Sequence, residues 1–197
     1  MDGGKYGLDE AVVEFCRKGF VLGSIGRLSP EKGYGDLIKA LKILIEHGVD
    51  AKLVIIGEGA ERCRLAKIGE KLGVVDRLLM PGYREMSKDY IKLFHVYVSS
   101  SLTEGLPVTW HEAMQRRAAA VARDVKGMPR ELGDGKIRLL VGPRSPQTIA
   151  MELWEIYKNR LVLSMPSYFL LINSAATMGL IDFLKGRKGA SWVSVAY

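Results

Sequence analysis

Two basic side chains five positions apart, Arg27 and Lys32, stand in a run that also contains Gly26 and Gly33. Glycines allow a backbone to approach a ligand closely, and a diphosphate requires fixed positive charges together with amide donors. The run therefore predicts a diphosphate site. On spacing alone, the two side chains could equally be solvent-exposed loop cations.

Two carboxylates eight positions apart, Glu104 and Glu112, stand in the run TEGLPVTWHEAM. Glu104 falls in a polar loop, and from Gly105 onward the following helix would offer free amide groups and its positive dipole end to an anion. Glu112 lies about two turns further along, where it could accept hydrogen bonds from sugar hydroxyls. The alternative is a helix-capping acid followed by a surface glutamate.

Two shorter motifs, GEG at residues 57–59 and MPGY at residues 80–83, each follow an apolar run. The first places Glu58 between two glycines. The second would present backbone groups and the ring edge of Tyr83 to a nucleobase. Either motif alone is also typical of an ordinary turn.

Short β-rich runs alternate with helical patterns along the chain, which indicates βαβ units and a parallel sheet. The expected strands cover residues 20–26, 53–56, 77–80, 96–99, 118–122 and 137–142. The predicted fold class is α/β, a Rossmann-like, doubly wound parallel sheet of about six strands. Ligands of such sheets sit beyond the carboxyl ends of the strands, so all four motifs fall on the ligand side.

The composition is that of an ordinary globular chain, with 197 residues of which 48% are hydrophobic and 26% charged. It excludes wholesale disorder, collagen-like repeats and a disulfide scaffold, and the length fits one domain or slightly more. Two cysteines, Cys16 and Cys63, favour a reducing compartment, and no Cys/His spacing is typical of a zinc site. The first residues show no signal-peptide pattern, so we expect a cytoplasmic protein without a metal site.

The net charge of +7 arises from 29 basic and 22 acidic side chains that are spread along the chain. Aromatic residues make up only 8% of the chain, so the clustered basic and aromatic pattern of nucleic-acid binding is missing. We expect a mixed-charge surface and no nucleic-acid partner.

The last part of the chain has a different composition, because residues 161–184 hold one charged side chain, Asp182. Their length raises the question of a membrane span, but Pro166, several serines and Gly179 interrupt the apolar pattern. A buried or partner-covered helix pair is favoured over a span, and peripheral contact with the inner face of the membrane stays open. The expected organisation is an N-terminal lead-in (residues 1–19), a Rossmann-like domain (20–160) and an apolar helical tail (161–197).

The motifs belong to a longer ordered series: GRLSPEKG, VIIGEG, LLMPGY, SSSLTEGLPVTWHEAM, ARDVKGMPREL and LLVGPRSP. In this order they resemble the C-terminal half of a group 1 (family 4) retaining glycosyltransferase, over residues 20–157. The resemblance implies the two-domain GT-B fold, whose C-terminal domain binds a UDP- or GDP-linked sugar donor without a metal or other cofactor. Residues 20–160 would be this nucleotide-sugar-binding domain.

The resemblance also implies a role for each motif residue. Arg27 and Lys32 would hold the donor diphosphate, and with Glu104, which would contact the transferred sugar, they form the expected catalytic group. Glu112 would bind ribose hydroxyls, while Glu58 would lie near the base. The other expected donor contacts are Gly26, Pro81, Gly82, Tyr83, Arg84, Gly105, Leu106 and Pro107.

The implied reaction is hexosyl transfer by displacement at the anomeric carbon, with retained configuration. Arg27, Lys32 and the helix dipole would stabilise the leaving diphosphate as its negative charge develops. The sequence holds no D-x-D run, which agrees with a metal-free site.

Several features depart from the family pattern. Residues 1–19 cannot supply the family's acceptor-binding domain, so an N-terminal acceptor domain or subunit is an expected partner. Phe94 and His95 replace the usual Ala-Asp, and bulky residues at 115–117 replace small ones. None of the three histidines, His47, His95 and His111, matches the family's catalytic histidine. The alternative function is a catalytically inactive nucleotide-sugar-binding or interaction module, the remnant of a truncated or split glycosyltransferase.

Overall fold

Six parallel strands form one sheet in the computed structural model, which describes residues 7–103, 108–115, 119–123, 138–141 and 145–159. The strands are β1 (Phe20–Ile25), β2 (Ala51–Ile56), β3 (Leu78–Gly82), β4 (Val96–Ser99), β5 (Ala119–Arg123) and β6 (Arg138–Val141). Their order across the sheet is β3-β2-β1-β4-β5-β6, and every neighbouring pair is parallel. The predicted Rossmann-like, doubly wound sheet is thereby confirmed.

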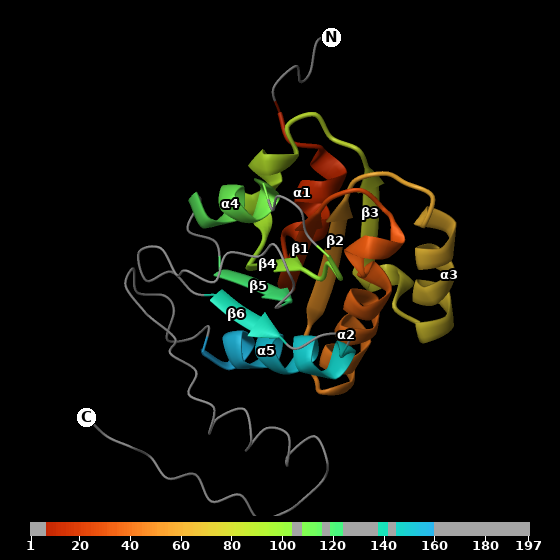
Figure 1. Cartoon of the computed structure of the whole chain (residues 1–197), viewed down its shortest axis with the longest axis vertical. Helices are drawn as coiled ribbons and strands as arrows, with labels where there is room; N and C mark the ends of the chain where they lie inside the picture. The colour runs from red at the N-terminus through yellow and green to blue at the C-terminus, as the bar shows by residue number, and fades with distance from the viewer. Residues whose placement is uncertain (1–6, 104–107, 116–118, 124–137, 142–144, 160–197) are drawn as a thin grey trace, which may run out of the picture.

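Helices cover both faces of the sheet (Figure 1). One face carries α2 (Tyr34–Glu46), α3 (Arg62–Leu72) and α5 (Pro146–Asn159). The other carries α1 (Glu10–Cys16), the 3-10 helix η3 (Ser87–Leu93) and α4 (Val108–Gln115). Two short 3-10 helices, η1 (Pro30–Lys32) and η2 (Val75–Arg77), precede α2 and β3.

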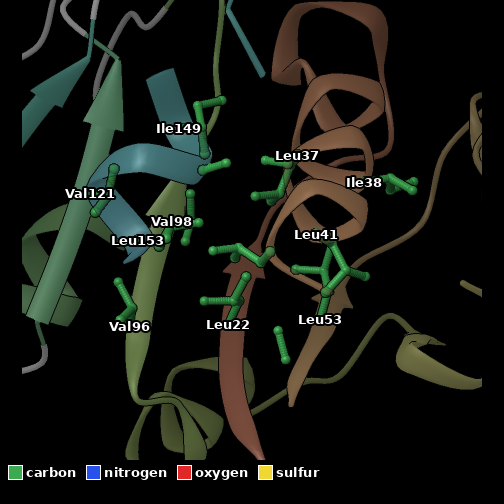
Figure 2. Packing of buried hydrophobic residues seen from close by; sticks show 14 of the residues in the cluster. Leu22, Leu37, Ile38, Leu41, Leu53, Val96, Val98, Val121, Ile149 and Leu153 are labelled. Carbon is green, nitrogen blue, oxygen red and sulfur yellow. The ribbon is translucent and has the colours of Figure 1, made fainter. Parts of the chain in front are cut away.

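The strands read as continuous apolar runs because they are buried from both sides. All six residues of β1 are buried, and β1 pairs in register with β2 from Phe20↔Ala51 to Ile25↔Ile56. Alternate side chains therefore enter different cores: Leu22 and Leu53 meet α2 and α5, whereas Val21 and Val54 meet the α1 side. Figure 2 shows the first core, with Leu37 and Leu41 of α2 above the strands and Leu153 of α5 beside them.

The helix signals of the sequence are largely confirmed. The spacing of apolar residues from Leu37 to Ile45 predicts a helix that stops at His47. In the structure Leu37, Ile38, Leu41 and Leu44 are buried, Ile45 is half-buried, and α2 ends at Glu46. The sequence also predicts that Ser145 opens a helix, and its Oγ atom accepts a hydrogen bond from the Thr148 N–H (3.2 Å) at the start of α5.

Two local predictions are wrong. The sequence predicts that Ser87 caps a helix through Phe94, but Ser87 is the first residue of the 3-10 helix η3, whose N-cap is Met86 and lacks a side-chain cap. The sequence also predicts that Pro81 and Gly82 stop the third strand, but both belong to β3. Proline is tolerated there because β3 is an edge strand and its register with β2 shifts between Val54 and Ile56.

One helix, α1, was not predicted from the sequence. Asp9 caps it, since Asp9 Oδ1 accepts a hydrogen bond from the Ala11 N–H (2.9 Å). Val12 and Cys16 are buried against the sheet, so the chain packs on the domain well before β1.

Phe94 and His95, which depart from the family pattern, join β4 to β1. The Val21 N–H donates to His95 Nδ1 (2.9 Å), and the His95 N–H donates to the Val21 carbonyl oxygen (2.8 Å). Phe94 lies over Gly23, where an added Cβ would come within 2.0 Å of the Phe94 ring. Both side chains therefore have structural roles.

Some predicted features lie outside the described residues. These are the 104–107 run with Glu104, the bulky residues 116–117 and the apolar stretch 161–184. Within the ranges that are described, none of the helices combines the length and the apolar character needed to cross a bilayer.

Candidate functional site

The loop after β1 carries Arg27 and Lys32. Arg27 is exposed and Lys32 is half-buried. A Cβ added to Gly26 would lie 2.8 Å from Tyr34 Oη and 3.5 Å from Lys32 Cε, so the lysine side chain passes over the end of β1. Glycine at position 26 leaves room for the Tyr34 hydroxyl, whereas the distance to Lys32 Cε is an ordinary van der Waals contact.

Glu31 lies among these cations. The Ser29 side chain, the Glu31 backbone amide and the charges of Arg27 and Lys32 hold the pKa of the Glu31 carboxyl below its usual range. Glu31 is therefore ionised at neutral pH and offsets part of the positive charge. An anionic ligand would meet two cations and one competing carboxylate in this loop.

The loop after β2 lies directly against the loop after β1. The Leu28 N–H donates to the Glu58 carbonyl oxygen (2.8 Å), and the Glu61 N–H donates to the Leu28 carbonyl oxygen (3.0 Å). A Cβ on Gly57 would lie 2.0 Å from the Gly26 carbonyl oxygen, and one on Gly59 would lie 2.3 Å from that of Leu28. The glycines of the GEG motif are required because the two backbones touch.

The Glu58 side chain reaches toward the end of β3. The Gly57 N–H donates to the Gly82 carbonyl oxygen (3.0 Å), and a Cβ on Gly82 would lie 2.8 Å from Glu58 Oε1 and 3.6 Å from Arg84 Nη1. Glu58 and Arg84 thus both approach Gly82. The motifs after β1, β2 and β3 form one continuous surface at the carboxyl edge of the sheet.

Arg62, which the sequence analysis did not single out, holds Glu58 in place. Its Nη1 atom contacts Glu58 Oε1 (2.8 Å), and its Nη2 atom donates to the Met80 carbonyl oxygen (2.7 Å). Glu58 and Arg62 are four residues apart, but Glu58 precedes α3, so the rule for ion pairs along one helix does not predict this contact.

Tyr83 and Arg84 follow β3 immediately. Tyr83 is 69% exposed. Arg84 forms an ion pair with Asp9, and its Nη1 atom donates to the Tyr83 carbonyl oxygen (3.0 Å). Arg84 therefore contacts α1 as well as the loop, and no sequence signal indicated this pairing across 75 positions.

The loop after β4 is fixed to the loop after β1. Ser100 Oγ donates to the Lys32 carbonyl oxygen (2.8 Å), and the Leu102 N–H donates to the Glu31 carbonyl oxygen (2.7 Å). The segment that leads into Glu104, Gly105, Leu106 and Pro107 consequently starts beside Lys32. Those four residues themselves lie outside the described residues.

Glu112 lies on α4, the helix that follows β4. The hydroxyl of Tyr97 in β4 donates to Thr109 Oγ1 (2.7 Å), and Ala113 is fully buried against the sheet. Glu112 is half-buried next to Ala113. Helix α4 is therefore anchored on both sides of this carboxylate.

The order of the strands places a topological switch point between β1 and β4. Strands β1 and β4 are neighbours, yet α2 after β1 covers one face and α4 after β4 covers the other. In doubly wound sheets such a topological switch point is where ligands bind. Arg27 and Lys32 lie on one side of it, and Glu112 lies on the other. Among the described residues, no His, Cys, Asp and Glu side chains are grouped so that they could hold a metal ion.

Residues 9–169 match the model of the family described as glycosyl transferases group 1. The chain belongs to the group 1 glycosyltransferases. Among relatives of this group 1 glycosyltransferase chain, the alpha-D-kanosaminyltransferase of Streptomyces kanamyceticus is 32% identical over 146 residues, which cover 73% of this chain and 36% of that protein. The chain spans about a third of the length of the curated relatives it matches.

Solved glycosyltransferase structures share the fold of this group 1 chain. The C-terminal domain of a group 1 glycosyl transferase (LpcC) from Francisella tularensis superposes with a TM-score of 0.65 at 22% identity, covering 82% of this chain and 89% of that one. A TarM variant from Staphylococcus aureus, crystallised with UDP among its ligands, has a TM-score of 0.67 at 21% identity, covering 87% of this chain and 36% of that one. The Rossmann-like fold is thus that of one half of GT-B glycosyltransferases.

Proposed function

We propose that this chain binds the nucleotide-sugar donor of a retaining, metal-independent glycosyltransferase. The observation that carries the proposal is the hydrogen-bonded convergence of the loops after β1, β2, β3 and β4 at one edge of the sheet. Lys32 crosses Gly26 at this edge, and its carbonyl oxygen accepts a hydrogen bond from Ser100. This arrangement supports the diphosphate role that the family resemblance implies for Lys32.

In the proposed site, Arg27 and Lys32 neutralise the diphosphate as it leaves the anomeric carbon. Charge-assisted hydrogen bonds from fixed cations stabilise a charge that grows during the reaction, which lowers the barrier more than it strengthens ground-state binding. These two residues would do the work that a divalent cation does in other transferases. The crystal structure of TarM with UDP supports a uridine diphosphate donor as the first candidate.

In the proposed site, one group of residues contacts the base of the donor, and a second group contacts its ribose, sugar and phosphate. Glu58, Pro81, Gly82, Tyr83 and Arg84 are placed along the end of β3, where the base would lie. On the other side of the switch point, Glu112 would bind the ribose, and residues 104–107 would meet the sugar and phosphate.

The acceptor would bind to an N-terminal domain or a partner subunit. The relatives are about three times as long as the matched region, which supports a second domain in the active enzyme. The apolar tail, or the partner, would then determine any contact with the inner face of the membrane.

The test is calorimetric titration of the chain with UDP and GDP. Lys32→Ala should weaken binding tenfold or more, because it removes a charge-assisted contact worth about 1.5–3 kcal/mol. The matched control is Lys42→Ala, which removes a lysine of α2 that pairs with Glu46 (3.4 Å) away from the carboxyl edge. Equal affinity in wild type and Lys32→Ala would contradict the proposal.

A transfer assay with UDP- and GDP-linked sugars separates an enzyme half from an inactive module. Donor binding that is followed by transfer once the acceptor domain is added supports the enzyme. Binding of the nucleotide without transfer in that reconstituted mixture would favour the inactive nucleotide-sugar-binding module instead.

A further inference from the structure

Three elements meet directly behind the loop that follows β3. Asp9 comes from the N-cap of α1, Arg84 from the loop and Tyr90 from η3. The Arg84 guanidinium forms an ion pair with Asp9 Oδ2, and the Asp9 N–H donates to Tyr90 Oη (2.8 Å). Tyr90 is only 3% exposed, so the junction is built on a buried hydroxyl.

Both charges of the junction are stabilised by their surroundings. The hydrogen bond from Arg84, aided by the Ala11 and Val12 amides, holds the pKa of Asp9 below its usual range. Asp9 in turn raises the pKa of Arg84, and the contact with Tyr90 adds to this shift. The two oxygens of Asp9 are divided between the Ala11 N–H and the Arg84 guanidinium.

The loop between β3 and this junction is a single exposed residue held at both ends. On one side, Gly82 belongs to β3, and its carbonyl oxygen accepts a hydrogen bond from the Gly57 N–H (3.0 Å). On the other side, Arg84 is held by Asp9, and its Nη1 atom donates to the Tyr83 carbonyl oxygen (3.0 Å). Tyr83 lies between these anchors with its side chain 69% exposed.

We propose that Asp9, acting through Arg84, is a positioning residue that orients the peptide and ring of Tyr83 toward the base of the donor. This inference rests on the proposed function, in which the end of β3 meets the base. Asp9 makes no contact with the ligand. Its carboxylate keeps the Arg84 guanidinium turned toward α1, so that the other nitrogen of the guanidinium holds the Tyr83 carbonyl.

The expected consequence is a contribution to the choice of nucleobase. UDP and GDP share the ribose and the diphosphate, so contacts with those parts cancel in the ratio of the two dissociation constants. A change in that ratio therefore reports the base end of the site alone. A variant that only weakens the fold or the phosphate contacts would shift both dissociation constants by the same factor.

The experiment measures the dissociation constants of UDP and GDP for the full chain and for Asp9→Asn. The amide keeps an oxygen for the helix cap but removes the charge that holds Arg84. We expect the ratio of the two constants to change fivefold or more, and Asp9→Glu to restore at least half of that change on a logarithmic scale. The matched control is Asp50→Asn, which breaks the Asp50–Arg77 ion pair just before the amino ends of β2 and β3. This variant should leave the ratio unchanged.

The outcomes separate the two proposals. If neither nucleotide binds the wild-type chain, the proposed function fails. If they bind and the ratio in Asp9→Asn stays within twofold of the wild-type ratio, the donor site stands and the positioning role is overturned. A ratio that also changes in Asp50→Asn would show that loss of any acidic side chain shifts the base preference, and would overturn the role of the Asp9–Arg84 junction as well.

Discussion

Gly23, in the middle of β1, leaves room for the ring of Phe94. An added Cβ would come within 2.0–2.3 Å of three carbons of that ring, and Phe94 is almost fully buried on the α1 side of the sheet. The family pattern has a small residue at position 94. In this chain, glycine in the strand and phenylalanine before the next strand form a complementary pair.

Gly23→Ala is expected to destabilise the fold by about 1–3 kcal/mol, because the added methyl group overpacks the core beneath Phe94. In a Phe94→Ala background the same methyl group fills part of the cavity, so its cost should fall by at least about 1 kcal/mol. Urea unfolding of the two single variants and the double variant measures this coupling.

Gly35→Ala is the control for this cycle. A Cβ at Gly35, in α2, would meet only Ile68 Cδ1 at 3.4 Å, so the substitution should be neutral or stabilising. An equal cost for Gly23→Ala with and without the Phe94 ring would show that the ring is not the cause.

His95 joins the two central strands at the switch point. Its Nδ1 atom accepts the hydrogen bond of the Val21 N–H (2.9 Å), which lies in β1 and is buried. The aspartate that is usual at this position of the family also offers an acceptor. The pairing of β1 with β4 thus extends by one residue through a side chain.

Replacement of His95 tests whether the acceptor atom is what matters. His95→Leu leaves the buried Val21 N–H unpaired and should destabilise the fold by about 1–3 kcal/mol. His95→Asn keeps an oxygen near the same place and should recover at least half of that loss. Chemical unfolding measures both variants, and equal destabilisation by Leu and Asn would contradict a hydrogen-bonding role.

Glu152 makes the stability of the whole domain depend on pH. It lies in α5 at 8% exposure, and among the described residues its Oε2 atom has no hydrogen-bond partner. Burial, and then the charge of Glu155, raises the pKa of Glu152 from 4.5 to about 7. The folded state disfavours the charged form of Glu152. The contribution of its protonated form to the free energy of unfolding is therefore fully present below pH 4.5 and is lost as the pH rises through about 7.

Glu152→Gln removes this titration. The variant should be more stable than the wild type at pH 8, by up to about 3 kcal/mol, and similar to it at about pH 4.5. Urea unfolding at the two pH values measures the difference. Glu46→Gln, which removes an exposed carboxylate paired with Lys42, should change stability by less than about 0.5 kcal/mol at either pH. A stability difference between Glu152→Gln and wild type that does not vary with pH would contradict the raised pKa.

The architecture followed from local patterns to a large extent. Six apolar runs predicted the six strands of the sheet, because strands buried on both faces read as continuous apolar segments. The errors fell where a local signal has two meanings. Pro81 usually ends a strand but is tolerated at a shifted register on an edge, and Ser87 begins a 3-10 helix that it does not cap.

The sequence offered candidate residues for the site but did not predict the contacts that hold them. Arg27, Lys32, Glu58 and Glu112 were each selected by residue type and spacing within loops on the ligand side. The spacing of Arg62 from Glu58 carried no helical signal, because Glu58 lies in the loop before α3. No sequence signal indicated that Asp9 and Tyr90 meet Arg84 behind the loop after β3. Asp9 is 75 positions from Arg84 and 81 positions from Tyr90.

The sequence by itself determined the fold class through its apolar periodicity, and its ordered motifs indicated the family. It also selected Arg27 and Lys32 as candidate diphosphate contacts, since glycine placement and charge spacing act over a few neighbouring positions. Only the tertiary structure decided why these residues are held as they are. Gly57 and Gly59 are required because the loops after β1 and β2 touch, and Arg84 is oriented by Asp9 of α1. Such contacts arise when distant segments are brought together by the burial of two cores, and no local pattern encodes them.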